Sequence, residues 1–395
     1  MLFEIGAAML TTSAVTALFN LPMSRRRKLR IIFRRNGFMR QVGKDMRQPI
    51  EGPSTKTEQY TEYSYVIPLG LTLTDNLAEA ISAAFSGGPV AVKSENGRIS
   101  IRFYERSLPD NLPYYAAPKM AEWKVPIGET LDGPIAHDFD KVPHMTVAGA
   151  TRQGKTVFLK ALITQLTENH ADNAELYLID MKGGLEFGKL EQLSNVAGVA
   201  SSVEEACALL TALQRQFNGD LRAFRRKGYA NILDTDIARR RFIFVDEAAQ
   251  LTPDKSDDKA TKQTKNECLA ILSEITRVAG ALGYRLIYAT QYPTADTLPR
   301  QIKQNSDAKI TFRLPTSVAS NVAIDESGAE KLTMPGRLIY RTHERVEAQG
   351  YYLSDEEMRR RLKLRKGGER NANSNAKHDQ PKMDSAPGGD IITFI

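Results

Sequence analysis

Residues 144–156 read HMTVAGATRQGKT, and this stretch decides the expected fold. A short apolar strand runs into the pattern G-x-x-x-x-G-K-T, and a helical pattern follows over residues 156–166. The two glycines allow a tight turn whose backbone N–H groups face phosphate, and the new helix adds its positive N-terminal end. The alternative is a glycine-rich turn in a fold that binds no nucleotide. The flanking strand and helix favour a phosphate-binding loop.

The side chains of this loop have expected roles. Lys155 reaches the β- and γ-phosphates, and the Thr156 hydroxyl ligates Mg²⁺, so ATP and Mg²⁺ are the expected cofactors. The residues expected to bind nucleotide are Gly149, Ala150, Thr151, Arg152, Gln153, Gly154, Lys155, Thr156 and Val157.

An acidic pair follows a second apolar strand, in the sequence FIFVDE of residues 242–247. The carboxyl ends of buried parallel strands meet at one edge of an α/β sheet, where the phosphate-binding loop also lies. We therefore expect Asp246 to hold Mg²⁺ through water beside Thr156. Glu247 is expected to polarise the attacking water as a general base.

Two further polar residues follow expected strands. Gln291 comes directly after RLIYAT (residues 285–290), where its amide can contact the γ-phosphate or its water; the alternative is a surface glutamine. Lys182 follows ELYLID (residues 175–180) and can sense phosphate, contact a neighbouring subunit or simply be solvated. The expected catalytic residues are Lys155, Asp246, Glu247 and Gln291.

Strands and helices alternate from about residue 125 to residue 363, which predicts an α/β fold. Alternation of this kind is typical of a mainly parallel sheet covered on both faces, here a RecA-like P-loop NTPase core. The other expected elements are helices at 203–227 and 267–282, and strands at 309–314, 337–340 and 344–352.

The N-terminus contains a 20-residue stretch, residues 5–24, without a charged side chain. This length can span a bilayer, and the eight Lys and Arg of residues 24–40 would keep the rest of the chain in the cytoplasm. We expect a single-pass membrane anchor at residues 1–24 in a bacterial cell membrane. An interfacial helix or a segment that docks on a partner membrane protein remains open.

Between anchor and motor, residues 25–59 read as a basic juxtamembrane segment and linker. Residues 60–124 predict a small α+β module with a strand near 63–67, a helix at 74–85 and a hairpin around the turn SENG. Residues 364–395 are expected to be disordered because they contain few apolar residues. Their apolar end, IITFI, is a docking peptide or a chance feature.

The composition sets limits on function. The net charge of +7 and the pI of about 9.2 suit a polyanionic partner, and basic tails supply part of the excess. Two cysteines in helical patterns do not support a disulfide framework or a cysteine metal site, and they fit a cytosolic catalytic region.

Taken together, these motifs resemble the FtsK/SpoIIIE family of DNA-translocating ATPases. PHMTVAGATRQGKT is similar to the family's PHLLVAGxTGxGKS, DMK to its IDPK strand and IFVDEAAQL to its Walker B strand. RVAGALGYRLIYATQYP is similar to GRAxGIHLVLATQRP, and residues 298–332 resemble the family's IKANIPTRIAF…ILDxxGAExLLG run. The resemblance covers roughly residues 60–355 and is most specific over 143–332.

The resemblance implies a homo-oligomeric ring, a hexamer in this family, with ATP at subunit interfaces and DNA passing through the centre without sequence recognition. A compact motor without a sequence-reading winged helix most resembles the coupling ATPases of Gram-positive conjugative plasmids and integrative elements. Those ATPases take DNA from a relaxase and pass it to membrane transfer-channel proteins. The alternatives are an ATPase of type VII-like protein secretion and a cytosolic plasmid or phage DNA translocase.

Two departures from the family pattern affect the site. Residues 151–153 are Thr-Arg-Gln where the family has Thr-Gly-Ser, and Asn321 stands where the family has an arginine that acts on the neighbouring subunit. The candidates for that missing cation are Lys182, Arg277, Arg300, Lys309 and Arg313.

Overall fold

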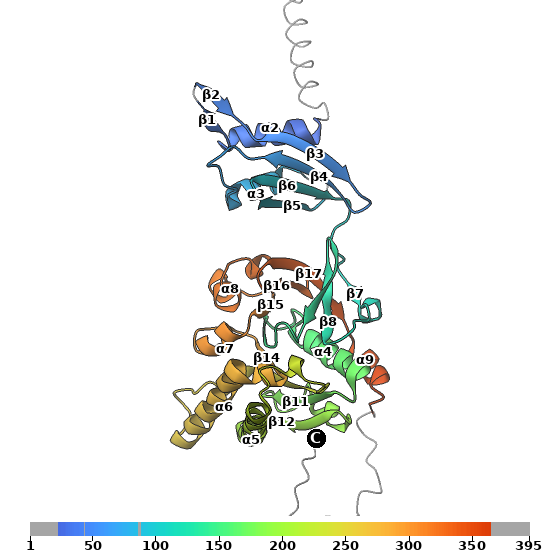
Figure 1. Ribbon diagram of the computed structural model, residues 1–395, viewed down its shortest axis with the longest axis vertical. Helices are drawn as coiled ribbons and strands as arrows, with labels where there is room; N and C mark the ends of the chain where they lie inside the picture. Colours follow the sequence, from blue (N-terminus) through green and yellow to red (C-terminus); the bar gives the residue numbers. More distant parts are fainter. Residues whose placement is uncertain (1–22, 43, 86–87, 365–395) are drawn as a thin grey trace, which may run out of the picture.

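The computed structural model describes residues 23–42, 44–85 and 88–364, which form a small N-terminal module and a larger motor body (Figure 1). The motor is built on one 11-stranded sheet, and the module on a 4-stranded sheet. Residues between the two bodies continue into the edge of the motor sheet. An α+β module and an α/β motor are both expected from the sequence, but the module begins before the expected residue 60, because residues 25–35 contribute to its core.

Six neighbouring strands of the motor sheet are parallel, so their carboxyl ends meet at one edge. In spatial order they are β12 (Val196–Ala200), β11 (Ala174–Asp180), β13 (Arg240–Asp246), β14 (Tyr284–Thr290), β10 (Met145–Ala148) and β15 (Ala308–Phe312).

Beyond these six strands the sheet continues with antiparallel strands. The expected mainly parallel sheet is therefore a mixed sheet. The antiparallel strands are β16 (Arg337–Arg341), β17 (Arg345–Tyr352), β8 (Lys124–Thr130) and β9 (Gly133–Asp138), with the short β7 (Leu112–Pro113) beside β17. The β8–β9 hairpin and β12 were not expected from the sequence, because each is short and carries few apolar residues in alternation.

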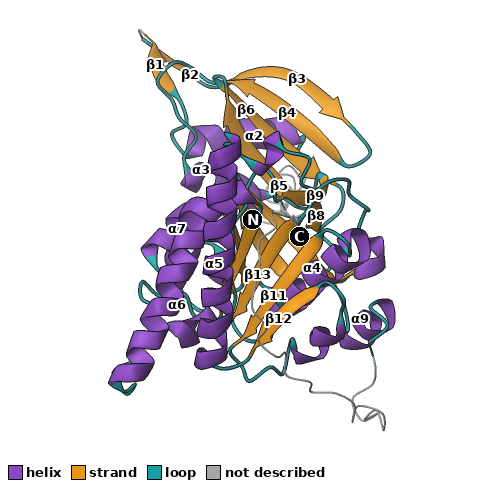
Figure 2. Cartoon of the chain, turned by 60° about the horizontal axis from the view of Figure 1, so that its bottom comes forward, coloured by secondary structure: helices purple, strands orange, loops and turns teal. Residues whose placement is uncertain are grey.

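The central strands are buried on both faces because their side chains alternate between two cores. In β13, Phe242 and Phe244 pack into one core, whereas Ile243 and Val245 pack into the other. Helix α4 (Lys155–His170) covers the first face, and α5 (Val203–Lys227) and α6 (Lys259–Val278) cover the second (Figure 2). The remaining motor helices are α7 (Arg300–Asn305), α8 (Ser317–Ile324) and α9 (Asp355–Arg361).

Helix α6 begins eight residues before the expected residue 267. Its N-terminus is set by Asp258, whose side chain accepts a hydrogen bond from the Thr261 N–H at 2.7 Å. The first two turns, KATKQTKN, are almost entirely polar, so hydrophobic periodicity did not reveal them.

The module's antiparallel sheet has the order β3 (Ile50–Lys56), β4 (Tyr60–Val66), β6 (Arg98–Tyr104) and β5 (Val90–Glu95). Helices α2 (Arg25–Arg35) and α3 (Asp75–Ala84) contribute to its core, which includes Leu29, Phe33, Tyr65, Ile81 and Ile99. The expected helix at 74–85 and the β5–β6 hairpin are confirmed.

The prediction that residues 25–59 are a basic juxtamembrane segment and linker is wrong, because they belong to the folded module. The described residues of this segment form α2, the hairpin β1 (Arg40–Val42)–β2 (Asp45–Arg47) and the edge strand β3. Arginines dominate α2 and conceal its narrow apolar stripe, while β3 is exposed and contains Pro53, as edge strands do.

Within the described residues, the structure contains no helix with the length and apolar character needed to cross a bilayer. The predicted anchor at 1–24 lies outside the described part of the chain except for its last two residues. The predicted disordered tail at 364–395 likewise lies outside it except for Leu364.

Removal of the Phe33 ring should destabilise the module. The side chain is fully buried and packs edge-on to Tyr65, with ring centroids 5.2 Å apart. Phe33→Ala should lower the module's free energy of unfolding by about 3–5 kcal/mol, measured by urea unfolding followed by hydrogen exchange. Leu69→Ala is the matched control, since Leu69 is 91% exposed. Equal, small effects of the two substitutions would mean that α2 is not part of the module's core.

Candidate nucleotide-binding site

The loop between β10 and α4 is held open by its neighbours in the sheet. The Ala150 N–H donates to the Arg313 carbonyl at 3.0 Å, and the Gln153 carbonyl accepts from the Gly336 N–H at 2.9 Å. A Cβ on Gly149 would lie 2.8 Å from the Phe312 Cβ, so only glycine fits there. Gly154 has a φ of 115° and begins α4. These contacts leave the loop's interior facing a cavity.

Donors for an anion line that cavity. The N–H groups of Lys155, Thr156 and Val157 lie in the first turn of α4, where they have no partner within the helix. The cavity measures about 690 Å³ and is bordered by seven of the nine expected loop residues and by Phe158. The lining loop residues are Ala150, Thr151, Arg152, Gly154, Lys155 and Thr156, together with Val157 at the helix start.

Arg152 adopts a backbone conformation that favours glycine, with a φ of 65°. The FtsK/SpoIIIE pattern has glycine at this position, and the positive φ explains why glycine is suited to it. A side chain in this region costs about 1 kcal/mol or more, and such strain is common in functional loops.

The lysine and the acidic pair meet as the sequence predicts. The Lys155 ammonium contacts Asp246 Oδ1, and its Nζ lies 3.9 Å from Glu247 Oε2. Lys155 and Asp246 are 3% and 0% exposed, so this contact is shielded from water and strong. The parallel β10 and β13 bring the two residues to the same edge, with β14 between them.

Glu247 links the other predicted residues. Its Oε1 accepts a hydrogen bond from the Gln291 N–H at 3.2 Å, and its Oε2 lies 3.6 Å from the Lys182 Nζ. The Gln291 side chain lies 3.3 Å from the Thr151 hydroxyl, which donates to it. Glu247 has a φ of 54°, a second strained backbone at the site. Lys182 therefore lies at its own protomer's cavity, which it also lines.

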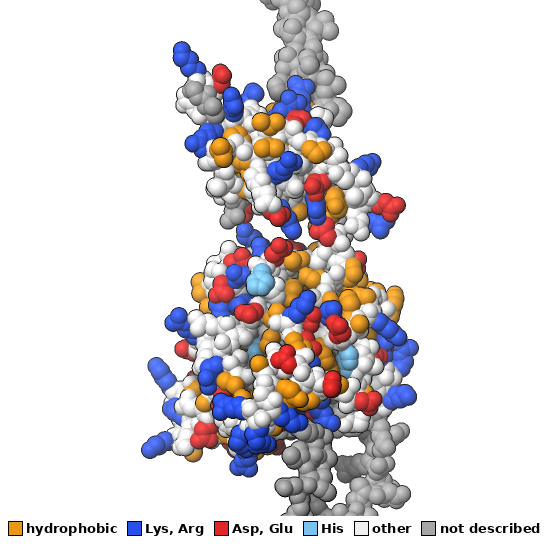
Figure 3. Space-filling view, viewed as in Figure 1, with side chains coloured by type: hydrophobic (Ala, Val, Ile, Leu, Met, Phe, Trp, Pro, Cys, Tyr) orange, Lys and Arg blue, Asp and Glu red, His pale blue; other side chains and the backbone are white. Residues whose placement is uncertain are grey.

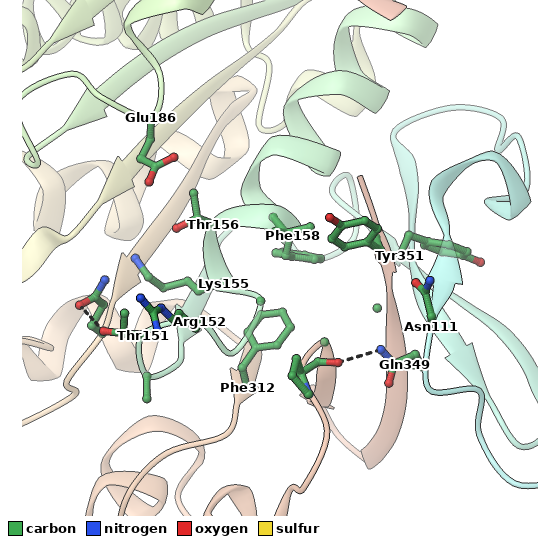
Figure 4. Close-up of a pocket in the computed structure, with 18 of the residues that line it drawn as sticks. Asn111, Thr151, Arg152, Lys155, Thr156, Phe158, Glu186, Phe312, Gln349 and Tyr351 are labelled. Carbon is green, nitrogen blue, oxygen red and sulfur yellow. Dashed lines mark hydrogen bonds between the residues drawn. The ribbon is translucent and has the colours of Figure 1, made fainter. Parts of the chain in front are cut away.

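The donor set fits a hydrated Mg²⁺ ion. Asp246 Oδ2 and Glu247 Oε2 are buried and have no hydrogen-bond partner among the described residues. Thr156 lines the cavity next to Lys155 (Figure 4). Asp246 and Thr156 suit Mg²⁺, which is usually held by one or two carboxylates together with phosphate and water.

Asp180 organises the loop that carries Lys182. Its Oδ1 accepts from the Lys182 N–H at 3.1 Å, and its Oδ2 accepts from the Glu186 and Phe187 N–H groups at 2.8 and 3.1 Å. Glu186 borders the cavity near Thr156 (Figure 4). Sequence patterns gave no signal for Glu186, which follows no expected strand directly.

The far end of the cavity was also missed. It is formed where β7 pairs with β17, and Tyr352 of β17 lines it. Asn111 and Tyr351 also lie at this end, with Phe158 and Phe312 between it and the loop (Figure 4). Residues about 240 positions apart in the chain meet here. No local pattern identifies such a pair.

The candidates for a cation acting on a neighbouring subunit fall into different environments. Lys309 lies 3.7 Å from Asp325, and burial lowers the pKa of its ammonium. Arg313 follows β15 beside its own phosphate-binding loop. Arg277 and Arg300 are exposed, and no carboxylate of the described chain lies within ion-pair distance of either. Asn321 is exposed on α8.

Comparisons with known proteins give the same family as the sequence motifs. Residues 117–242 match the family model FtsK/SpoIIIE. DNA translocase FtsK of Staphylococcus aureus is 26% identical over 334 residues, which cover 79% of this chain and 40% of that protein. The corresponding protein of Lactococcus lactis is 25% identical, with 80% and 44% covered. The chain thus matches less than half the length of these relatives.

Among solved structures, the pCW3 conjugation coupling protein TcpA with ATPγS is 25% identical, with a TM-score of 0.62. The match covers 87% of this chain and 99% of that chain. The cytoplasmic domain of the Thermomonospora curvata type VII secretion ATPase EccC is 23% identical, with a TM-score of 0.52, and the match covers 33% of that chain. The second likeness shows the fold alone.

Replacement of Arg152 by glycine should relieve its backbone strain. Arg152→Gly should raise the free energy of unfolding of the motor by about 1 kcal/mol, since glycine adopts positive φ without steric cost. Arg152→Ala is the control because it removes the side chain but keeps the Cβ. Thermal unfolding compares the two, and equal melting temperatures would mean that no strain resides at this position.

Loss of the Lys155 ammonium should abolish nucleotide binding. Lys155→Ala should reduce ATP affinity below detection, measured by fluorescence of a labelled ATP analogue. Lys189→Ala is the matched control, since Lys189 is exposed in the 3₁₀ helix Gly188–Gln192. A thermal melt of each variant detects misfolding, because the substitution leaves Asp246 buried without its cation. A folded Lys155→Ala protein with unchanged ATP affinity would exclude this loop as the phosphate site.

Glu247→Gln should separate binding from turnover. The amide keeps the acceptor for the Gln291 N–H but cannot take a proton, so the hydrolysis rate should fall by roughly 10²–10⁴-fold while ATP still binds. Glu191→Gln, an exposed glutamate, is the control. A variant that hydrolyses ATP at the normal rate would remove Glu247 from the chemistry.

Proposed function

We propose that this chain, which belongs to the FtsK/SpoIIIE family of ATPases, is an ATP-driven DNA translocase that acts as a coupling protein in conjugative DNA transfer. It works as a homo-oligomeric ring, a hexamer, that moves DNA without sequence recognition. Its motor is cytoplasmic and a single N-terminal segment anchors it in a bacterial membrane. A relaxase and membrane transfer-channel proteins are its partners.

One observation carries this proposal: the match to the conjugation coupling protein TcpA extends over nearly all of both chains. The N-terminal module is therefore included in the likeness, as well as the motor. The matched FtsK proteins are more than twice as long as the segment they share with this chain. The overall arrangement of module and motor supports a coupling protein more closely than a chromosome translocase.

The residues of the site support ATP hydrolysis. The loop N–H groups and Lys155 bind and orient the β- and γ-phosphates, and Thr151 and Gln291 close the side next to Glu247. Mg²⁺, held by Thr156 and Asp246, would supply positive charge that offsets charge on the transferred phosphoryl oxygens. Glu247 takes a proton from the attacking water. Lys182, 3.6 Å from that carboxylate, holds it in place.

The nucleobase would occupy the far end of the cavity. With the phosphates at the loop, the base would lie near Asn111 and Tyr352, which line the same cavity. The Tyr352 ring is 52% exposed, so it is free to pack on a base, and the Asn111 amide offers both a donor and an acceptor.

The cation that completes the site across the subunit interface is assigned to Arg300 or Arg277. Both are exposed and unpaired within the described chain, as a residue that reaches a neighbouring protomer must be. Lys309 is engaged by Asp325, and Lys182 and Arg313 lie at the site of their own protomer.

ATP hydrolysis by the full chain, with and without single- and double-stranded DNA at two salt concentrations, tests the proposal. A DNA motor that grips phosphates should hydrolyse ATP several-fold faster with DNA, and the stimulation should weaken with salt. Glu247→Gln is the control for contaminating ATPases. A rate indifferent to both DNA forms would contradict DNA transport and favour an ATPase that recruits protein substrates.

A further inference from the structure

The positive charge of this chain is concentrated on one short segment. Residues 23–57 contain eleven Lys and Arg against two acids, a net charge of +9, whereas the whole chain carries +7. The rest of the chain is therefore slightly acidic. The excess that suits a polyanionic partner lies in the N-terminal module and not in the motor.

The structure separates the cations of α2 into two groups. Arg25, Arg26 and Lys28 turn inward, with their charged groups 4.7, 5.5 and 4.6 Å from the ring centroids of Phe103, Tyr63 and Phe85, respectively. These three are explained by the packing of the helix on its sheet.

The second group points away from the sheet. Arg27, Arg30 and Arg34 are exposed and recur at intervals of three and four residues, so they form one stripe on the helix surface. The opposite face, with Leu29 and Phe33, is fully buried. Within the described residues, Glu51 is the single carboxylate paired with this stripe, at 3.2 Å from Arg30.

The β1–β2 hairpin extends the same charged surface. Exposed Arg40, Lys44 and Arg47 lie on the hairpin, which follows α2 at the end of the module away from the motor (Figure 1). Lys and Arg side chains gather along this upper margin of the module (Figure 3). Met46 in the hairpin is 56% exposed, so an apolar side chain stands among the cations.

We propose that this basic face, formed by the outer stripe of α2 and the β1–β2 hairpin, binds the anionic phospholipid headgroups of a membrane. The pairing of surface cations with an exposed apolar side chain is suited to the boundary between headgroups and acyl chains. The 20 uncharged residues that end at Ser24 directly precede α2, which favours a lipid surface over nucleic acid. The inference rests on the membrane location within the proposed function and adds lipid selectivity to it.

The test uses the full chain mixed with nanodiscs of phosphatidylcholine alone or with added phosphatidylglycerol. Arginine modification by phenylglyoxal is followed by peptide mass spectrometry. Arg27, Arg30 and Arg34 should each react roughly fivefold more slowly with the anionic nanodiscs, the factor that corresponds to about 1 kcal/mol per cation at an anionic surface. High salt should reduce this protection. The exposed Arg222, Arg225 and Arg226 of α5 are internal controls and should react equally in both.

Variants separate charge from fold. Arg27→Gln/Arg30→Gln/Arg34→Gln should abolish the lipid-dependent protection of Arg40 and Arg47, whereas the triple lysine variant should retain it. Arg222→Gln/Arg225→Gln/Arg226→Gln removes the same charge from the motor and should change nothing at the module.

Three results would overturn the inference: equal protection by neutral and anionic lipid, no protection by either, or protection by DNA in place of lipid. A separate measurement, co-elution of the chain with neutral nanodiscs, tests the predicted membrane anchor. If the chain does not co-elute with neutral nanodiscs but its arginines are still protected by anionic ones, the anchor is refuted and the lipid-binding face is supported. DNA-stimulated ATP hydrolysis tests the proposed motor activity independently of these two readouts.

Discussion

The parallel arrangement of β10, β14 and β13 is the constraint on which the rest of the site depends. It brings a phosphate-binding loop and an acidic pair, about 90 residues apart in the chain, to one edge of the sheet. The Lys155–Asp246 contact is the product of that arrangement. Both side chains are buried, so a charge on either one without its partner would destabilise the fold. The pair that the chemistry requires therefore also contributes to the stability of the motor.

The nucleotide site and the basic face occupy separate parts of the molecule. The motor's cavity is bordered by elements from β7 to β17, whereas the basic face is formed by α2 and the first hairpin. The module meets the motor through polar contacts, such as that of Tyr104 with Asp132 at 2.9 Å. The two proposals assign these bodies different tasks: the module would contact the membrane surface, and the motor would act on nucleotide and DNA.

Sequence reasoning predicted the parts of the structure that local patterns specify. The strand–loop–helix at residues 144–170 and the strand before Asp246 are strongly apolar and end in distinctive residues, and helix α5 matches its predicted bounds. The approach of Lys182 and Gln291 to Glu247 followed from one rule, that parallel strands end at a common edge.

The missed features depend on tertiary contacts or on amphipathic elements dominated by charge. Arginines surround the apolar stripe of α2, so the sequence predicts only a basic juxtamembrane segment there. The edge strand β3 is polar, so the sequence predicts a linker. The far end of the cavity needs β7 to lie against β17, which no local pattern predicts. The strain at Arg152 also becomes visible only when its backbone angle is known.

Displacement of streptavidin from biotinylated DNA ends tests the central claim most directly, because it detects movement along DNA whichever strand form the motor prefers. The account predicts ATP-dependent displacement by the full chain from single- or double-stranded DNA, and none by the Glu247→Gln variant. ATP hydrolysis without displacement from either form would contradict a DNA-translocating motor.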